Sequence, residues 1–226
     1  LVGSEMCIRD RALEREKTIR LNVLAASTLV TQALISYKKD HDGLHFRLIQ
    51  NSQCEDADIT VFTRENFQIP TDTKERYELF KERIFLAVPH NSPYASEESV
   101  RLQDFAHEDF ISLSGSRSIR TICDRYCMQA GFVPHIIYES DSPDTVKNLI
   151  ASGLGVGFWP HYTWGMDSME QIRLLPIAEP TCQRAIILQL HRHARGQEAV
   201  CSFYAFLSRY LRQLKAAEQH LSLIHI

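Results

Sequence analysis

The feature that most constrains the fold of this chain is a regular alternation of short apolar runs with amphipathic helical stretches. The apolar run IRLNVLA at residues 19–25 is typical of a strand, and the apolar residues that follow at 30, 33, 34 and 37 have the spacing of one helix face. The pattern returns at residues 109–130, where DFISLS precedes a second helical stripe. Strands that alternate with helices are typical of parallel, doubly wound sheets. The two repeats therefore predict an α/β fold with two lobes.

Cap and turn residues indicate where the helices begin and end. Ser27 and Thr28 are expected to cap the first helix. Ser142 followed by Pro143 predicts a later helix start, because serine accepts a backbone hydrogen bond and proline suits the first helical position. A last helix is expected to bury one apolar face, made of Val200, Phe203, Leu207, Tyr210, Leu211 and Leu214.

The remaining apolar runs are short enough to be strands. The polar residues 63–82 between two of these runs favour a loop. The strands are expected at residues 45–50, 58–62, 82–89, 135–140, 156–159, 172–177 and 184–190.

Composition limits the classes of function. The 226 residues are 44% hydrophobic and carry a formal net charge of -3. Because Lys and Arg do not outnumber Asp and Glu, the chain by itself is a poor candidate for binding a nucleic-acid backbone. No apolar run is long enough to cross a bilayer, and no signal peptide opens the chain. We therefore expect a cytoplasmic protein.

The two ends of the chain resemble translated sequencing-adapter sequence more than folded protein. Residues 1–11 (LVGSEMCIRDR) and 221–226 (LSLIHI) are expected to carry no function. On this interpretation the natural start of the protein is missing.

Three glycines alternate at positions 153, 155 and 157 within DTVKNLIASGLGVGFWP, residues 144–160. A dinucleotide-binding loop needs its glycines between a strand and the following helix, because the phosphate sits on the helix N-terminus. Here a helix precedes the glycines and a strand follows them. We therefore expect no cofactor: Gly153 ends the helix, and Gly155 and Gly157 mark places where backbone or ligand comes close.

Two pairs of residues have spacings that occur in metal sites. Cys123 and Cys127 lie four apart, but both fall on an apolar helix stripe, where a free cysteine behaves as a small hydrophobe. His191 and His193 lie in HRHARG, which is typical of a solvated edge, with no nearby pair of carboxylates or cysteines to complete a ligand set. We therefore predict no metal site, and mostly free thiols among the six cysteines.

Serines at two helix starts raise the question of catalysis. Ser114 and Ser116 lie in LSGSRS, which lacks the G-x-S-x-G elbow of serine hydrolases, so we predict no catalytic residue and no enzyme. A hydroxyl at a helix start, beside free backbone N–H groups, also suits a carboxylate or similar anion. The starts at 27–28 and 114–118 could face one another across a cleft, with Phe158 and Trp159 as an apolar wall.

Five segments follow one another along the chain: IRLNVLAAST, ADITVF, ERIFLAVPHNSPYA, LQDFAHEDFISLSGSRSIRTICDRYCMQAGFVP and DTVKNLIASGLGVGFWP. In this order they resemble the effector-binding domain of LysR-type transcriptional regulators, over nearly all of residues 18–215. This resemblance implies a fold like that of type 2 periplasmic binding proteins, with two Rossmann-like lobes and an interlobe cleft for a small-molecule inducer. Lobe I would comprise residues 19–83 and 185–215, and lobe II residues 84–184.

The resemblance also implies partners and contact residues. Such domains follow a winged helix-turn-helix and a dimerising linker helix, and residues 12–18 look like the end of that linker. The full-length protein would bind DNA through the helix-turn-helix missing here and form a homodimer or homotetramer. Transferred position by position, the inducer-contacting residues are Ser27, Thr28, Phe62, Thr63, Ser114, Gly115, Ser116, Arg117, Gly157, Phe158 and Trp159.

One departure from the family pattern concerns the first lobe. Family members usually have a helix between the second and third strands, and NSQCEDA at residues 51–57 leaves no room for one. The transfer of contact positions is therefore least direct at Phe62 and Thr63. A solute-binding protein of a transport system with the same fold is the alternative, and an export signal upstream would distinguish it from the regulator.

Overall fold

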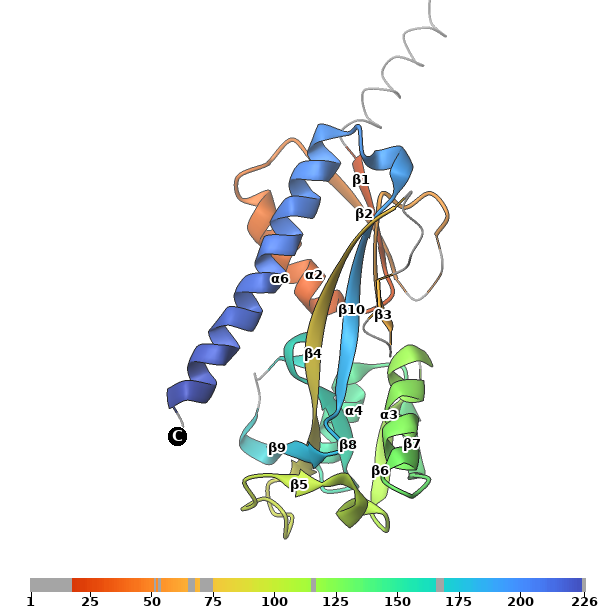
Figure 1. Cartoon of the computed structure of the whole chain (residues 1–226), viewed down its shortest axis with the longest axis vertical. Coiled ribbons are helices and arrows are strands. Elements are labelled where there is room, and N and C mark those ends of the chain that lie inside the picture. The colour runs from red at the N-terminus through yellow and green to blue at the C-terminus, as the bar shows by residue number, and fades with distance from the viewer. Residues whose placement is uncertain are drawn as a thin grey trace, which may run out of the picture. The chain divides into compact units, whose positions relative to one another are not determined.

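Strand β1 (Thr18–Val23) lies at the centre of three parallel strands. It pairs on one side with β2 (His45–Gln50) and on the other with β3 (Ile59–Arg64). Ile19, Leu21 and Val23 of β1 are buried. The computed structural model describes residues 18–50, 52, 54–64, 68–69, 75–114, 117–165 and 169–224, with the backbone alone at residues 117, 169 and 214–224 (Figure 1).

The chain divides into two units. Unit 1 comprises residues 1–62, 68–80 and 187–226, and unit 2 comprises residues 63–67 and 81–186. Two long strands, β4 (Arg76–Pro89) and β10 (Gln183–Leu190), contribute residues to both units. The mixture of parallel strands and helices confirms the predicted α/β class.

Unit 1 is held together by aromatic packing between its two helices, α2 (Ser27–Lys38) and α6 (Glu198–Ile224). The Tyr37 ring on α2 lies 5.1 Å from Phe203 and 5.0 Å from Phe206 on α6, and its hydroxyl donates to Ser202 Oγ at 2.9 Å. Phe46 of β2 packs edge-on against Phe203 at 5.0 Å. The predicted apolar faces of both helices enter the core at their described side chains, and the side chain of Leu214 lies outside the described residues.

Unit 2 contains an antiparallel and a parallel group of strands. Strand β4 pairs antiparallel with both β8 (Gly157–Pro160) and β9 (Ile172–Glu179). β9 also pairs in parallel with the short β5 (Val100–Arg101). Separately, β6 (Asp109–Leu113) and β7 (His135–Ser140) form a parallel pair.

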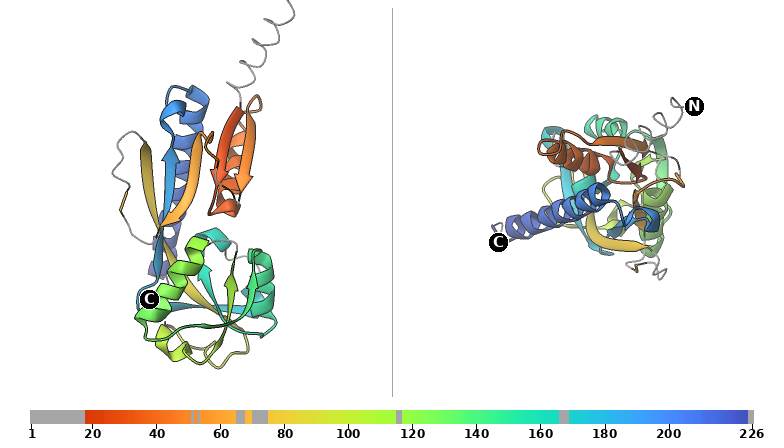
Figure 2. Two further views of the ribbon diagram at one scale, coloured as in Figure 1. Left: turned by 90° about the vertical axis from the view of Figure 1, so that its right-hand side faces the viewer. Right: turned by 90° about the horizontal axis from the view of Figure 1, so that it is seen from above.

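Helices α3 (Arg117–Gln129) and α4 (Pro143–Ala151) flank the β6–β7 pair (Figure 2). Successive side chains of a strand point to opposite faces. Phe110 accordingly belongs to the apolar cluster that contains Ile119 and Ile122 of α3, and Ile111 to the cluster with Val146 and Ile150 of α4. The β6–β7 part of unit 2 is therefore doubly wound. The short helices of the chain are α5 (His161–Trp164) and the 3-10 turns η1 (Leu102–Phe105), η2 (Met169–Gln171) and η3 (Arg192–Ala194).

The predicted bounds are confirmed at most elements. Ser142 caps α4 by accepting from the Thr145 N–H at 3.3 Å, and Gly153 follows that helix with a φ of 78°. Between β2 and β3 the described residues form no helix, as expected. The predicted loop over 63–82 is wrong at both ends, because β3 extends to Arg64 and β4 begins at Arg76.

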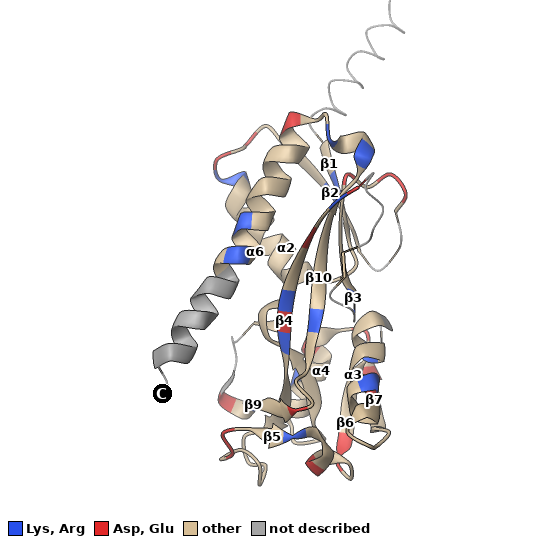
Figure 3. Cartoon of the chain, in the orientation of Figure 1, with Lys and Arg blue, Asp and Glu red and all other residues tan. Residues whose placement is uncertain are grey.

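Lysines and arginines are interspersed with aspartates and glutamates along the described elements (Figure 3). Within the described part of the chain, no helix combines the length and the apolar character that a membrane crossing requires.

Candidate functional site

The start of α2 is the first predicted contact region, and the structure corrects how this helix begins. The cap position is Ala26, not Ser27 or Thr28, and no side chain bonds the first-turn N–H groups. Ala26 adopts the left-handed conformation with φ 58° and ψ 33°, and its carbonyl accepts from the Val30 N–H at 3.0 Å. Ser27 and Thr28 are exposed in the first turn. An uncapped first turn leaves N–H groups available to an anion.

Phe62 and Thr63 lie at the carboxyl end of β3. Since β1 and β3 are parallel neighbours, Phe62 shares a sheet edge with the segment that leads from β1 into α2, where the Leu24 N–H donates to Val61 O at 2.8 Å. Thr63 is only 7% exposed. Its hydroxyl has no hydrogen-bond partner among the described residues. A buried hydroxyl without a partner is costly and is a place where a ligand can bond.

The third predicted region follows β6. Ser114 is exposed, and its N–H donates to Ser140 O at the end of β7 at 2.8 Å. Arg117 begins α3. Gly115, Ser116 and the Arg117 side chain lie outside the described residues, so their predicted contacts stay predictions.

The two aromatic residues of β8 differ in their environments. Trp159 is 1% exposed, its ring packs edge-on against Trp164 at 5.4 Å, and its Nε1–H donates to Gly165 O at 3.0 Å. Phe158 is only partly buried and stacks on Phe110 with ring centroids 5.9 Å apart. Phe158 is therefore the better placed of the two to meet a ligand.

The glycines near β8 allow close approach of the backbone. A Cβ at Gly155 would lie 2.6 Å from Asp109 O, and one at Gly157 would lie 2.9 Å from Ile111 O and 2.8 Å from Ile150 Cδ1. Residues 155–157 thus run directly against β6, where Val156 bridges to Phe110. The expected close approach at Gly155 and Gly157 is confirmed, and the atoms that come close belong to the backbone of β6 and to core side chains.

A small pocket, partly open to solvent, lies within unit 2 beside Phe158. Its walls come from β6, β7, β8 and α3, with Trp164 at the end of α5, and they are mostly apolar. Of the predicted contact residues this pocket contains Phe158. The lining residues are Phe110, Ile111, Ser112, Leu113, Ile119, Arg120, Cys123, Asp124, Pro134, Ile136, Phe158 and Trp164.

Arg120 is a pocket residue that the sequence reasoning missed. It lies one turn into α3, directly after the serine-rich segment, and that position was the available signal. Its guanidinium contacts Asp124 Oδ2 at 2.7 Å and also pairs with Glu139 of β7. Burial lowers the pKa of Arg120, but these two carboxylates outweigh that effect and raise it. The cation is therefore neutralised within unit 2.

The buried cysteines behave as predicted. Cys123 and Cys127 lie in the apolar cluster under α3 together with Cys182, and all three are free thiols. Burial raises the pKa of Cys127 to about 12 and raises the pKa of Cys123 and Cys182 as well. Since the thiolate is the reactive and metal-binding form, these side chains act as small apolar groups.

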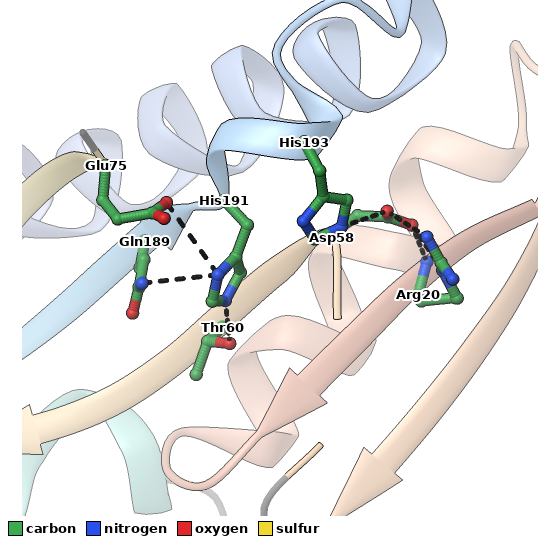
Figure 4. A network of polar contacts seen from close by, with 7 residues as sticks. All are labelled: Arg20, Asp58, Thr60, Glu75, Gln189, His191 and His193. Carbon is green, nitrogen blue, oxygen red and sulfur yellow. Dashed lines mark hydrogen bonds and ion pairs between the residues drawn. The ribbon is translucent and has the colours of Figure 1, made fainter. Parts of the chain in front are cut away.

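The histidine pair lies in a different setting from the one expected. His193 Nε2 is 3.4 Å from Asp58 Oδ1, and His191 Nδ1 is 3.8 Å from Glu75 Oε2 (Figure 4). The setting of the two rings therefore differs from the solvated edge that the sequence suggested, since each ring has a carboxylate beside it. His191 Nε2 also bonds Thr60 Oγ1 at 2.8 Å. Among the described residues no group of three or more His, Cys, Asp or Glu side chains could hold a metal ion.

Comparisons with known proteins agree with this architecture. A curated relative, the uncharacterized HTH-type transcriptional regulator YybE of Bacillus subtilis, is 28% identical over 166 residues, which cover 71% of this chain and 56% of the relative. The transcriptional dual regulator GltC of Bacillus subtilis is 24% identical over 200 residues, covering 84% and 65%. The chain therefore spans less than two thirds of either relative.

Among solved structures, the effector-binding domain of QuiR in complex with shikimate matches with a TM-score of 0.69 and 18% identity, covering 87% of this chain and 97% of that one. Both curated relatives are named as transcriptional regulators, and neither is a transport protein. The family model described as the LysR substrate binding domain matches residues 12–212. The chain belongs to the LysR substrate-binding domain family.

Proposed function

We propose that this chain is the ligand-sensing part of a LysR-type transcription factor and that a small anionic effector controls its activity. The family match over residues 12–212 is the observation that carries this proposal. The two named relatives are transcriptional regulators, and the effector-binding domain of the neighbour QuiR binds the small molecule shikimate. Small-molecule sensing requires no catalytic residue, and we propose that the chain is not an enzyme.

The proposed contacts combine helix starts with buried polar groups. The uncapped first turn of α2, with Ser27 and Thr28, supplies N–H and hydroxyl donors for an anionic group. Thr63 supplies a buried hydroxyl without a partner among the described residues. In unit 2 the contacts come from the segment 114–117 and from Phe158, which lines the pocket.

Regulation would follow from a shift in populations. An effector that binds one arrangement of the protein more tightly than another moves the equilibrium by its difference in affinity. In the full-length protein, a cytoplasmic homodimer or homotetramer, that shift would change how an attached helix-turn-helix sits on its operator. Recovery of the upstream sequence tests this part, because an export signal in place of a helix-turn-helix contradicts it.

A thermal-shift screen of small carboxylates and aromatic acids on residues 12–220 tests the effector site. A ligand present at 100 times its Kd stabilises the folded state by about 2.7 kcal/mol, which raises the Tm. The double variant Thr28→Val with Ser116→Ala should remove this ligand-induced rise and leave the ligand-free Tm nearly unchanged.

The matched control is Thr31→Val with Ser99→Ala, which makes the same substitutions outside the proposed contacts. Thr31 is half-buried and lies three residues further along α2, and Ser99 is exposed in a loop of unit 2. This control should keep the full ligand-induced shift. A ligand-induced rise in Tm that survives in Thr28→Val with Ser116→Ala contradicts the proposed contacts.

A further inference from the structure

The beginning of β10 is bonded to two helices of unit 2, and the side chains that bond it to α5 are almost completely buried. Arg184 is 4% exposed, and its Nε donates to Glu82 Oε2 of β4 at 2.5 Å. Its second guanidinium nitrogen donates to Thr163 Oγ1 of α5 at 2.5 Å, and the Thr163 N–H donates to Glu82 Oε1 at 2.7 Å. Glu82, Thr163 and Arg184 thus form a closed triangle, which we call the buried triad.

The neighbouring residue Gln183 is bonded to α3. The Tyr126 hydroxyl donates to Gln183 O at 2.7 Å and accepts from the Gln183 N–H at 2.9 Å. One phenol therefore occupies both backbone groups of a strand residue. Two consecutive residues of β10 are held in this way, one by α3 and the next by α5.

A buried ion pair is not needed for stability alone. Withdrawing two charges from water is costly, and a pair of apolar side chains of similar volume often stabilises a fold equally well. The hydrogen bonds of the buried triad fix how the elements that carry its residues are oriented to one another, because each bond tolerates only a narrow range of distances and angles. α5, only four residues long, is fixed to β4 and β10 through Thr163.

Both helices adjoin the segments proposed to contact the effector. The segment 114–117 runs into α3, and Gly157–Trp159 lead through Pro160 into α5. β10 then continues from residues 183–186 of unit 2 into residues 187–190 of unit 1. We propose that Glu82 and Arg184 are positioning residues that fix the effector-contacting segment Gly157–Trp159 to β10 through α5, and that Tyr126 fixes the last turns of α3 to the same strand. The link to the effector rests on the proposed function, whereas the fixation itself does not.

Amide hydrogen exchange on the ligand-free chain tests the fixation. Arg184→Met should speed exchange at residues 157–165 at least tenfold, and should leave the first half of α3 close to the wild-type rate. Tyr126→Phe removes a single oxygen and should speed exchange at the Gln183 amide and in the last turns of α3. Arg101→Met, which breaks an exposed ion pair with Asp104 in unit 2, is the control and should leave residues 157–165 unchanged.

The double variant Glu82→Leu with Arg184→Met separates positioning from general stability. It removes both charges together, so its Tm should stay near that of the wild type while exchange at residues 157–165 remains at least tenfold faster. Wild-type exchange at these residues in the double variant would overturn the proposal. An equal rise at every protected amide of unit 2 would also overturn it, because a purely structural role predicts that result.

Ligand binding gives a second readout that separates this proposal from the proposed function. With benzoate or shikimate as the probe, a compound that binds the wild type should bind the double variant about tenfold more weakly. An unchanged Kd in the double variant contradicts positioning of the effector segments. If no carboxylate binds the wild type, the proposed function loses its support, and the exchange experiment still decides whether the segments are fixed to β10.

Discussion

Each unit of the molecule contains one fully buried carboxylate paired with an arginine, and the two pairs differ in their access to water. In unit 1, Asp58 pairs with Arg20 at 2.8 Å, and the Arg20 side chain is 28% exposed. In unit 2, Glu82 pairs with Arg184, which is only 4% exposed. Water can replace a lost partner only where it can reach the remaining group. The Glu82–Arg184 pair, which we call the sealed pair, therefore depends entirely on protein partners. The Asp58–Arg20 pair, which we call the open pair, does not.

Removal of the carboxylate from the sealed pair should have the largest effect. Glu82→Ala leaves the Arg184 guanidinium buried without a counter-ion and also removes the acceptor of the Thr163 N–H, so we expect a loss of about 3–5 kcal/mol in the free energy of unfolding. Urea unfolding of the full chain measures the loss. A change below about 1 kcal/mol would show that water reaches this site and would remove the distinction between the two pairs.

The same truncation in unit 1 should cost less. Asp58→Ala removes bonds from the Arg20 backbone N–H and from its side chain, but the exposed part of that side chain can turn to water. We expect a loss of about 2 kcal/mol in the same urea experiment. Asp56→Ala, at an exposed position two residues earlier, is the control and should change stability by less than about 0.5 kcal/mol. A loss for Asp58→Ala that equals the loss for Glu82→Ala contradicts the role given to water.

The smallest expected effect is a dependence of stability on pH, which we attribute to His191. Burial lowers the pKa of His191 below its ordinary value, against the opposing effect of Glu75. The unfolded chain, with a pKa of about 6.5 at this position, then takes up the proton first as the pH falls. The contribution of His191 to stability is therefore full above about pH 6.5 and declines as the pH drops through the interval down to the lowered pKa.

His191→Gln should flatten this decline. Its loss of stability between pH 7 and pH 5 should be smaller than that of the wild type by up to about 1 kcal/mol, measured by urea unfolding at both pH values. His193→Gln serves as the comparison at the neighbouring, 47% exposed ring. Equal slopes for His191→Gln and the wild type would mean that burial of His191 does not affect the pH dependence.

The sequence predicted correctly those local features that depend on residues close together in the chain. The cap at Ser142, the turn after α4 at Gly153 and the buried stripe of α3 follow from local spacing, and the structure confirms all three. The start of α2 was mispredicted, because the left-handed Ala26 takes the cap position that Ser27 and Thr28 were expected to fill. No residue pattern marks that conformation.

Long-range partners explain the other differences. Glu82 was placed at the boundary between the predicted loop and the strand 82–89, and its burial was not foreseen because its partner Arg184 lies 102 residues away. Ionic pairing makes a charged residue suitable for a buried strand position. His193 looked solvated for the same reason, since Asp58 is far from it in the sequence. For the candidate site, the strand ends that carry Phe62, Thr63 and Ser114 were predictable, whereas the unpartnered Thr63 hydroxyl and the pairing of Arg120 required the structure.

The missing side chains at Gly155 and Gly157 have a consequence for how chains of this kind are recognised. These positions have no room for a Cβ because backbone and core atoms of unit 2 fill the space, and the effector does not enter into that requirement. The glycine-rich stretch at residues 153–157 is therefore a signature of the close packing of this segment against β6. A match at these positions therefore reports how unit 2 packs, and any ligand specificity has to come from other residues.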